Sequence, residues 1–145
     1  MSTATPGVDR ATLALRILTP EGVLFEGDVW RVIAPSVDGD VAIMARHAPL
    51  EAFLRIGETL VRLADESATR YATTEGFMSV EADGVLILVE QGEEASAIDR
   101  PRAEAALKRA EDALASLPDD DEVGRASAAA ARARAETRLR VSAGG

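Results

Sequence analysis

Charged side chains gather in the segment EEASAIDRPRAEAALKRAE, which begins at Glu93. Asp99 and Arg102 lie at its centre, where an apolar alternation gives way to an alanine-rich pattern. An aspartate at such a point can cap a helix, because its carboxylate accepts a hydrogen bond from a free backbone N–H group. The same carboxylate and guanidinium could instead form one end of a ligand site. These two residues alone leave both interpretations open.

Arginine is abundant in the C-terminal part of the chain. Residues 93–145 carry 9 Lys or Arg and 11 Asp or Glu, a balance of -2, whereas residues 1–92 carry 7 Arg and 14 Asp or Glu, a balance of -7. Guanidinium groups bind phosphate or carboxylate oxygens in pairs. A local anion site in the tail is therefore possible, although the net charge of -9 argues against nucleic acid as a partner.

Few residues are available for other chemistry. The chain has no cysteine and one histidine, His47, which excludes thiolate metal sites, multi-histidine metal sites and a cysteine nucleophile. No nucleophile pattern accompanies His47, so we interpret it as a structural residue whose ring nitrogens bond to a turn. The acidic segment PDDDE indicates a solvated loop, since nothing nearby completes a cation site. We expect no enzyme, no metal site and no required cofactor.

The first two thirds of the chain show the alternation that is typical of strands. Leu13, Leu15 and Ile17 share one face of TLALRIL, ADG indicates a hairpin, and Gly27 is expected to break VLFEGDVWRVIAP into two strands. Turn signals every eight to twelve residues or so predict an antiparallel sandwich or barrel of about eight to ten strands, and we favour an antiparallel β-sandwich of about ten. The aromatic residues are interpreted as core or interface residues: Phe25, Trp30, Phe53 and Phe77.

A pair of helices is predicted after the strands. Asp99 suits the N-cap and Pro101 the first turn of a helix. Its apolar face recurs at spacings of three and four: Ala103, Ala106, Leu107, Ala110, Ala113, Leu114 and Leu117. The second helix is expected from about Glu122 to Arg140, with an almost purely alanine stripe: Val123, Ala126, Ala130 and Ala133. The short loop between them predicts an antiparallel α-helical hairpin.

The alanine content bears on how firmly this hairpin is held. Alanine favours helix formation, but a methyl group buries little apolar area, at about 25 cal/mol per Å². Each helix should form readily while being held weakly to whatever it lies against. Such an element could detach and dock elsewhere. The alternative is that it merely pads the sandwich.

The sequence predicts two domains, a β-sandwich over residues 1–94 and a helical hairpin over residues 95–145. Residues 1–10, with Pro6 and Gly7, have the composition of a loose leader. No secretory segment opens the chain, and no apolar run reaches the roughly 20 residues that a membrane span needs. We expect a soluble, cytoplasmic protein.

The segment DGDVAIMARHAPLEAFLRIGETLVRL resembles the epsilon subunit of bacterial F-type ATP synthases. Its matching residues stand in register with a conserved sandwich segment of that family: Gly39, Asp40, His47, Ala48, Pro49 and Leu50. TEGFMSVEADGVLILVE and LRILTPEGVLFEGDV are also similar, so the resemblance covers about residues 12–140. Ala42, Ala45 and Glu75 depart from the family pattern, which affects turn geometry rather than chemistry.

This resemblance implies a non-catalytic rotor subunit of a proton-translocating synthase. The sandwich would attach to the gamma subunit of the central shaft and to the c-subunit ring. The hairpin would reach the alpha and beta subunits of the catalytic head and inhibit ATP hydrolysis. The implied location is the cytoplasmic face of the bacterial membrane, where the protein is peripheral. The alternative function is a free-standing nucleotide-sensing module.

The resemblance also implies a regulatory ATP site. Some bacterial epsilon subunits bind ATP through an [IL]-D-x-x-R-A motif, which Ile98, Asp99, Arg102 and Ala103 match. A glutamate five residues before the isoleucine and arginines of both helices belong to that site, and Arg132 competes with Arg134 for one position. The implied ATP-binding residues are Glu93, Ile98, Asp99, Arg102, Arg109, Arg134 and Arg138. The alternative is that these arginines are solvated charges paired with neighbouring glutamates.

Overall fold

A computed structural model describes residues 10–143, with ten strands followed by a 3-10 turn and two α-helices. Residues 1–9 of the expected leader and residues 144–145 of the expected hairpin lie outside the described residues. The strands are β1 (Leu13–Thr19), β2 (Gly22–Val29), β3 (Arg31–Ser36), β4 (Gly39–Met44), β5 (Leu50–Leu54), β6 (Gly57–Arg62), β7 (Ala68–Thr73), β8 (Gly76–Glu81), β9 (Gly84–Val89) and β10 (Gly92–Glu94). The helical elements are η1 (Ala95–Ala97), α1 (Arg100–Ser116) and α2 (Glu122–Ala143).

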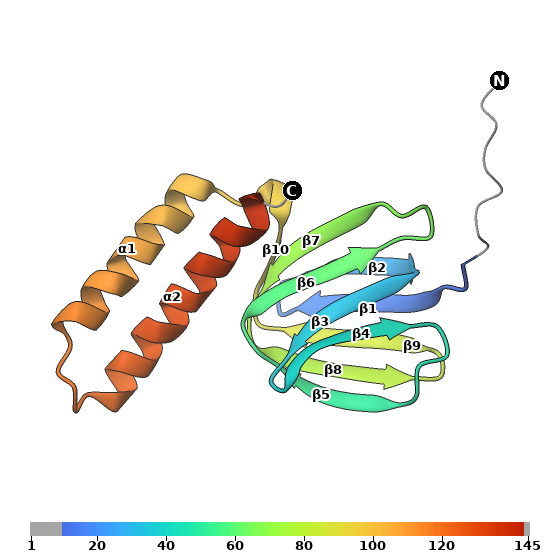
Figure 1. Cartoon of the computed structure of the whole chain (residues 1–145), viewed down its shortest axis with the longest axis horizontal. Helices are drawn as coiled ribbons and strands as arrows, with labels where there is room; N and C mark the ends of the chain where they lie inside the picture. The colour runs from blue at the N-terminus through green and yellow to red at the C-terminus, as the bar shows by residue number, and fades with distance from the viewer. Residues whose placement is uncertain (1–9, 144–145) are drawn as a thin grey trace, which may run out of the picture.

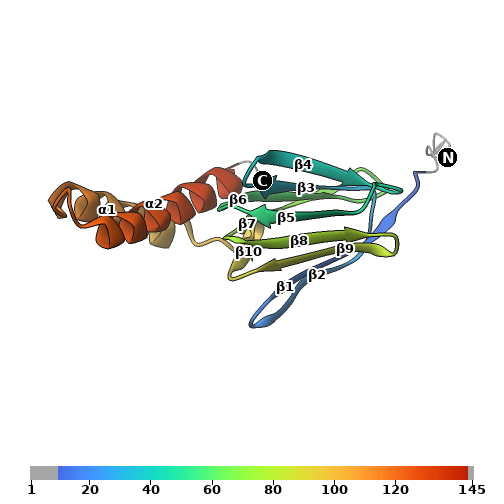
Figure 2. The ribbon, with the colours of Figure 1, turned by 90° about the horizontal axis from the view of Figure 1, so that it is seen from below.

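The strands form one sheet that folds over on itself into two layers (Figures 1 and 2). Its order is β10-β7-β6-β3-β5-β8-β9-β1-β2, with β4 paired to β3. Alternate side chains of the strands meet between the layers, as two stacked sheets require. Most of the large, fully buried side chains are apolar and not aromatic, and they include Leu15, Ile17, Val32, Met78 and Ile87. The predicted sandwich is confirmed.

Two details of the sandwich differ from the sequence prediction. Gly27 does not break the strand: it lies within β2, opposite Leu15 of β1, so the ladder continues through it. The chain instead turns at Trp30. The backbone N–H of Trp30 donates to the carbonyl oxygen of Arg62 at 2.9 Å, where β3 begins to pair with β6. One pairing, β1 with β9, is parallel although the other pairings are antiparallel.

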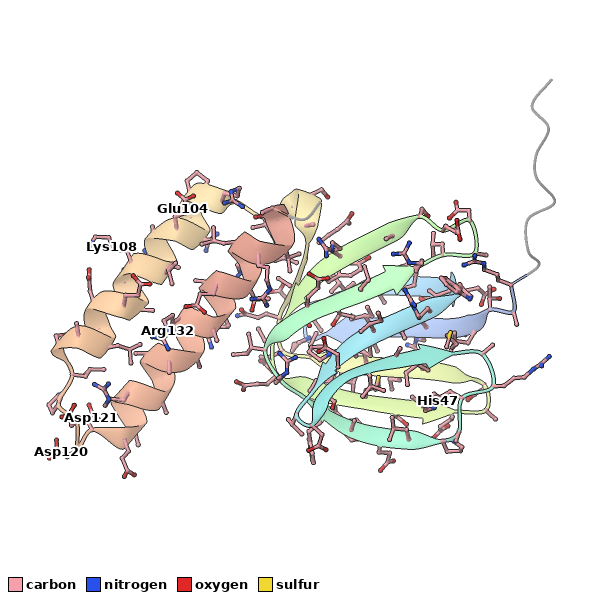
Figure 3. All side chains as sticks on the ribbon, in the orientation of Figure 1. His47, Glu104, Lys108, Asp120, Asp121 and Arg132 are labelled. Carbon is pink, nitrogen blue, oxygen red and sulfur yellow. The ribbon has the colours of Figure 1, made fainter. Side chains whose placement is uncertain are left out.

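The helical hairpin is confirmed, and its first helix follows the predicted face. Ala103 and Ala110 of α1 are buried, and the helix begins after Asp99 with Pro101 in its first turn. The turn between the helices carries Asp120 and Asp121 at the tip of the hairpin (Figure 3). One Asp121 side-chain oxygen accepts from the Gly124 N–H at 2.9 Å, so the acidic loop caps the start of α2.

The second helix buries a different face from the one that was predicted. Val123, which was placed in its stripe, is 83% exposed. The buried residues are Ala128, Ala135, Thr137 and Val141, and α2 continues to Ala143 rather than ending at Arg140. A helix with alanine on several faces offers little contrast between them, so spacing alone could not select the buried one.

The hairpin contacts the sandwich through its second helix. α1 packs against α2, and α2 in turn contacts β6, β7 and η1 (Figure 1). Two arginines add polar links between the helices. Arg125 Nη1 donates to the carbonyl oxygens of Leu114 and Leu117 at the end of α1, and Arg100 Nη1 donates to that of Leu139 near the end of α2. Arg125 thus satisfies carbonyl groups that the end of α1 leaves free.

Candidate functional site

Asp99 is a helix cap in this structure. Its Oδ1 accepts a hydrogen bond from the backbone N–H of Arg102 at 3.1 Å. The side chain of Arg102 is exposed and is not engaged by that bond. The cap fixes the start of α1, and with it the place of the Arg102 guanidinium beside the last strand. The two interpretations of this pair are therefore compatible, since capping uses one carboxylate oxygen of Asp99 and leaves the other unused by the cap.

Glu93 and Arg138 join the sandwich to the second helix. Arg138 Nε lies 2.8 Å from Glu93 Oε1, and their side chains are 22% and 38% exposed. Arg138 Nη2 also lies 3.4 Å from Gln91 Oε1. Because both partners are partly shielded from water, this pair is stronger than a fully exposed one. It positions Arg138 at the junction of β10 and α2.

Beside this junction is a hollow of about 510 Å³. Most of the residues implied for ATP binding line it: Glu93, Asp99, Arg102, Arg109 and Arg138. Residues from β10, from the cap of α1 and from both helices thus meet in one place, although they are far apart in sequence. The volume lies within the range of about 300–1,000 Å³ that is common for ligand sites.

A second hollow, of about 530 Å³, lies between the two helices. Arg109 and Arg138 line it as well, and Arg134 joins them there. Arg132 lines neither hollow and instead lies 3.6 Å from Glu136, one turn along the helix. Of these two arginines, Arg134 is therefore the one that lies at a hollow. Within residues 10–143, Arg102, Arg109 and Arg134 form no ion pair with a glutamate or aspartate.

The structure also shows where sequence reasoning was incomplete. Ile98 lies between η1 and α1, half-buried, and lines neither hollow. Glu21 and Glu90 do line the first hollow, and nothing in the sequence indicated it. They come from the β1–β2 turn and the end of β9, which approach the hairpin only in the folded chain. The first hollow is thus mixed in charge, whereas arginine provides the charged groups of the hollow between the helices.

Burial and a nearby carboxylate perturb one group close to this junction. Tyr71 of β7 lies opposite Glu94 of β10. Burial raises the pKa of Tyr71 to about 12, and the negative charge of Glu94 adds to this shift. The phenol therefore stays neutral over the physiological range and contributes no charge to the site.

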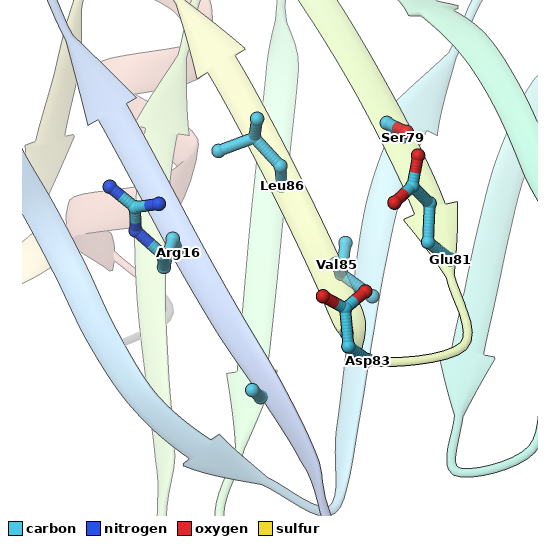
Figure 4. A pocket seen from close by; sticks show the side chains of 8 residues that line it. Arg16, Ser79, Glu81, Asp83, Val85 and Leu86 are labelled. Carbon is cyan, nitrogen blue, oxygen red and sulfur yellow. The ribbon is translucent and has the colours of Figure 1, made fainter.

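Another hollow, of about 250 Å³, lies on the outer face of β1, β8 and β9 (Figure 4). Arg16 and the carboxylates of Glu81 and Asp83 line it. Within the described part of the chain, no group of three His, Cys, Asp or Glu residues is placed to hold a metal ion.

His47 lies in the loop between β4 and β5 (Figure 3). Its Nδ1 lies 2.6 Å from the carbonyl oxygen of Ala48, and its backbone N–H donates to the carbonyl of Met44. One ring nitrogen of His47 thus bonds to the turn, as was expected.

Apolar side chains form a row across the outer face of the sandwich. Phe53, Phe77, Leu88, Leu18 and Val23 lie opposite one another on β5, β8, β9, β1 and β2, and we call these five residues the apolar row. Phe53 is 69% exposed, Val23 56% and Leu88 42%. The rings of Phe53 and Phe77 pack edge to face with centroids 5.9 Å apart. Three of the five side chains of the apolar row are thus exposed and two are half-buried, and exposed apolar patches are typical of interaction surfaces.

The fold and the site define a class of protein: a sandwich with an outward apolar row, carrying an arginine-lined helical hairpin at one end. Family sequence models agree with both parts. ATP synthase, Delta/Epsilon chain, beta-sandwich domain, matches residues 12–95, and the corresponding long alpha-helix domain matches residues 96–143. The chain belongs to the ATP synthase delta/epsilon chain family.

Curated relatives support this membership along nearly the whole chain. The ATP synthase epsilon chain of Syntrophomonas wolfei is 37% identical over 132 residues, which is 91% of this chain and 95% of the relative. That of Bacillus velezensis is 40% identical over 123 residues, 84% of this chain and 92% of the relative. The resemblance to bacterial epsilon subunits is confirmed.

Solved structures share the fold. A chain of the Euglena gracilis mitochondrial ATP synthase structure, described as OSCP/F1/c-ring, matches with a TM-score of 0.77 at 19% identity, covering 94% of this chain and 85% of that chain. A chain of the Tetrahymena thermophila mitochondrial ATP synthase central stalk matches with a TM-score of 0.60 at 15% identity, covering 92% and 98%. Among the described helices of the present chain, none is long and apolar enough to cross a membrane.

Proposed function

We propose that this chain is a non-catalytic rotor subunit of a proton-translocating F-type ATP synthase, located at the cytoplasmic face of the bacterial membrane. The sandwich binds the gamma subunit of the shaft and rests on the c-subunit ring, so the protein is peripheral to the membrane through the complex. Family membership and the epsilon-chain relatives support this proposal. The fold is also shared with a chain from a central-stalk structure.

The hairpin is the regulatory part in this proposal. In its folded state it lies against β6 and β7, as in this structure. In an extended state it reaches the alpha and beta subunits of the head and inhibits ATP hydrolysis. Small buried side chains on α2 support such a switch, because Ala135, Thr137 and Val141 together bury less apolar area than leucines would.

One observation carries the ATP part of the proposal: Arg102, Arg109, Arg134 and Arg138 come together around two adjoining hollows. Guanidinium groups bind phosphate oxygens in pairs, so the hollow between the helices receives the triphosphate. Glu93 and Asp99 accept hydrogen bonds from the adenine amino group or the ribose hydroxyls. Ile98 directly precedes Asp99 but lines neither hollow. ATP bound in this way stabilises the folded hairpin, because only the folded state assembles all four arginines.

A truncation tests the regulatory role. A chain ending before Asp99 keeps every strand, including β10, and loses both helices. Synthase assembled with it should retain its subunit composition and hydrolyse ATP faster than synthase with the full chain. Unchanged hydrolysis in an intact assembly would contradict the inhibitory role, while loss of assembly would contradict the assignment of the shaft contact to the sandwich.

The apolar row favours a subunit over the alternative of a free-standing nucleotide-sensing module. In a free-standing module the exposed side chains of Phe53 and Leu88 would stay in contact with water. In a subunit of a complex, a neighbouring subunit covers them. Co-purification separates the two functions. The proposed function predicts that the chain is recovered together with the gamma subunit. Recovery of the chain alone would support the free-standing nucleotide-sensing module.

A further inference from the structure

The only tryptophan of the chain is stacked against two arginines. The guanidinium carbon of Arg10 lies 4.0 Å from the centroid of the Trp30 ring, and that of Arg31 lies 4.9 Å from it. Attraction between a cation and the face of an indole ring accounts for either contact alone. Two like charges are thereby placed near one ring.

A third arginine joins this cluster. Arg62 of β6 lies directly opposite Arg31 of β3. The backbone carbonyl oxygen of Arg62 accepts from the backbone N–H of Trp30. Arg62 Nη1 donates to the carbonyl oxygen of Glu66 at 3.1 Å, and Arg10 Nη2 donates to the Glu66 carboxylate. We call Arg10, Trp30, Arg31 and Arg62 the Trp30 cluster.

Each arginine of the Trp30 cluster has a guanidinium nitrogen without a partner. Arg10 Nη1, Arg31 Nε and Arg62 Nε are buried and make no hydrogen bond with any described residue. A buried donor without an acceptor is costly, and more so when it is charged. These are also the only three buried side-chain nitrogen or oxygen atoms without a partner among residues 10–143, so the deficit is confined to one cluster.

The Trp30 cluster carries more positive than negative charge. Among the described residues, the one carboxylate that pairs with an arginine of the cluster is that of Glu66, which pairs with Arg10. The neighbouring carboxylate of Asp65 is already bonded to the N–H and hydroxyl groups of Ser67. The cluster therefore keeps an excess of positive charge and three free N–H groups, a combination that matches a tetrahedral oxyanion with several acceptor oxygens.

We infer that the Trp30 cluster is an anion site, and that it binds a doubly charged oxyanion of the phosphate type. The Arg10, Arg31 and Arg62 donors bind the oxyanion, and the Trp30 ring holds the first two side chains in place. This site lies where β6 ends and β7 begins (Figure 1). Its residue Arg62 also lines a hollow that Ser96 of η1 and Ser142 of α2 border. None of its residues lines the hollows proposed for ATP, so it does not depend on the proposed function.

Trp30 provides a direct probe, because the fluorescence of this single tryptophan reports on its own cluster. The full chain is titrated with inorganic phosphate, with sodium chloride at equal ionic strength and with sodium acetate. Phosphate should give a saturable change in emission, chloride none and acetate a weaker one. Arg31→Gln should weaken phosphate binding about tenfold or more, since a charged hydrogen bond is lost.

Three variants serve as controls. Arg70→Gln removes the same charge from the neighbouring strand β7, where Arg70 pairs with Glu58, and should leave phosphate binding unchanged. Arg102→Ala should also leave it unchanged, because that side chain belongs to the hairpin hollow. Should Arg31→Gln fail to fold by circular dichroism, Arg62→Lys keeps the charge, lacks the guanidinium Nε–H and should still weaken binding.

Each contrary result overturns the inference. A phosphate response no larger than that of chloride means that there is no site, and equal responses to acetate and phosphate remove the phosphate assignment. A response that survives in Arg31→Gln or Arg62→Lys places the binding elsewhere. Asp9 precedes Arg10 in sequence, so Asp9→Asn is tested too. Phosphate binding that appears only in Asp9→Asn would mean that the Asp9 carboxylate, and not phosphate, pairs with the Trp30 cluster in the unaltered chain.

Discussion

Glu93 of β10 and Arg138 of α2 form an ion pair of 2.8 Å between positions 45 residues apart. The pair joins the sandwich to the helix that carries the hairpin contact. Arg138 also lines both hollows of the candidate ATP site. Docking of the hairpin and binding of a nucleotide therefore involve the same side chain, which is the physical basis for coupling one to the other.

The strength of this pair can be measured with a double-mutant cycle. Glu93→Gln, Arg138→Gln and the double variant are compared by urea unfolding. We expect a coupling of about 1 kcal/mol, at the upper end for ion pairs that are partly exposed. The exposed pair Lys108–Asp112, at 3.2 Å within α1, is the control and should couple by only about 0.3 kcal/mol. Equal values for both pairs would show that Glu93–Arg138 has no special part in docking.

Two arginines of α2, only two residues apart, should differ in their effect on ATP binding. Arg134→Ala removes a guanidinium from the hollow between the helices and should weaken ATP binding about tenfold. Arg132→Ala removes the same group from a side chain that pairs with Glu136, and should change affinity little. Isothermal titration calorimetry of the isolated chain measures both. The reverse order would assign the ligand position to Arg132.

The sequence predicted those features of the fold that depend on local pattern. Spacings of three and four identified Ala103 and Ala110 on the buried face of α1, and Asp99 was identified as its cap. The prediction of the buried face of α2 was wrong. Alanine lies on several sides of this helix, and its packing in the folded chain determines which side is buried. Glu21 and Glu90 were missed in the site, since only the fold brings them near Arg102. The contact of Arg10 with Trp30 was missed for the same reason, because Arg10 was assigned to a loose leader.

High pH should destabilise the sandwich through Tyr71. Burial and the charge of Glu94 raise its pKa to about 12 in the folded state, whereas in the unfolded chain it is close to 10. The stabilisation from neutral Tyr71 is complete below about pH 10 and is lost as the pH rises towards about 12, for a total of about 2 kcal/mol. Tyr71→Phe should flatten this part of the stability–pH curve measured by urea unfolding. A curve of the same slope in Tyr71→Phe would contradict the assignment.

The apolar row should affect association rather than folding. Phe53→Ser removes an exposed ring that contacts Phe77, so it should cost the isolated chain about 1 kcal/mol or less. Recovery of the chain with the gamma subunit should nevertheless fall sharply. Ile87→Ala, in the core of the same sheet, is the contrasting variant and should cost about 2–5 kcal/mol. Undiminished recovery of Phe53→Ser would show that the shaft binds another face.

The coupling of ATP to the hairpin is tested most directly by a distance across the molecule. The chain has no cysteine, so spin labels can be attached at Val123→Cys near the hairpin tip and Val37→Cys on the sandwich, both exposed positions. Pulsed electron spin resonance then gives the distance distribution with and without ATP. We predict that ATP narrows the distance distribution of the labelled chain to one short distance. ATP should not change the distribution once Arg134→Ala and Arg138→Ala are added. A distribution that is identical with and without ATP in the labelled chain would contradict the coupling.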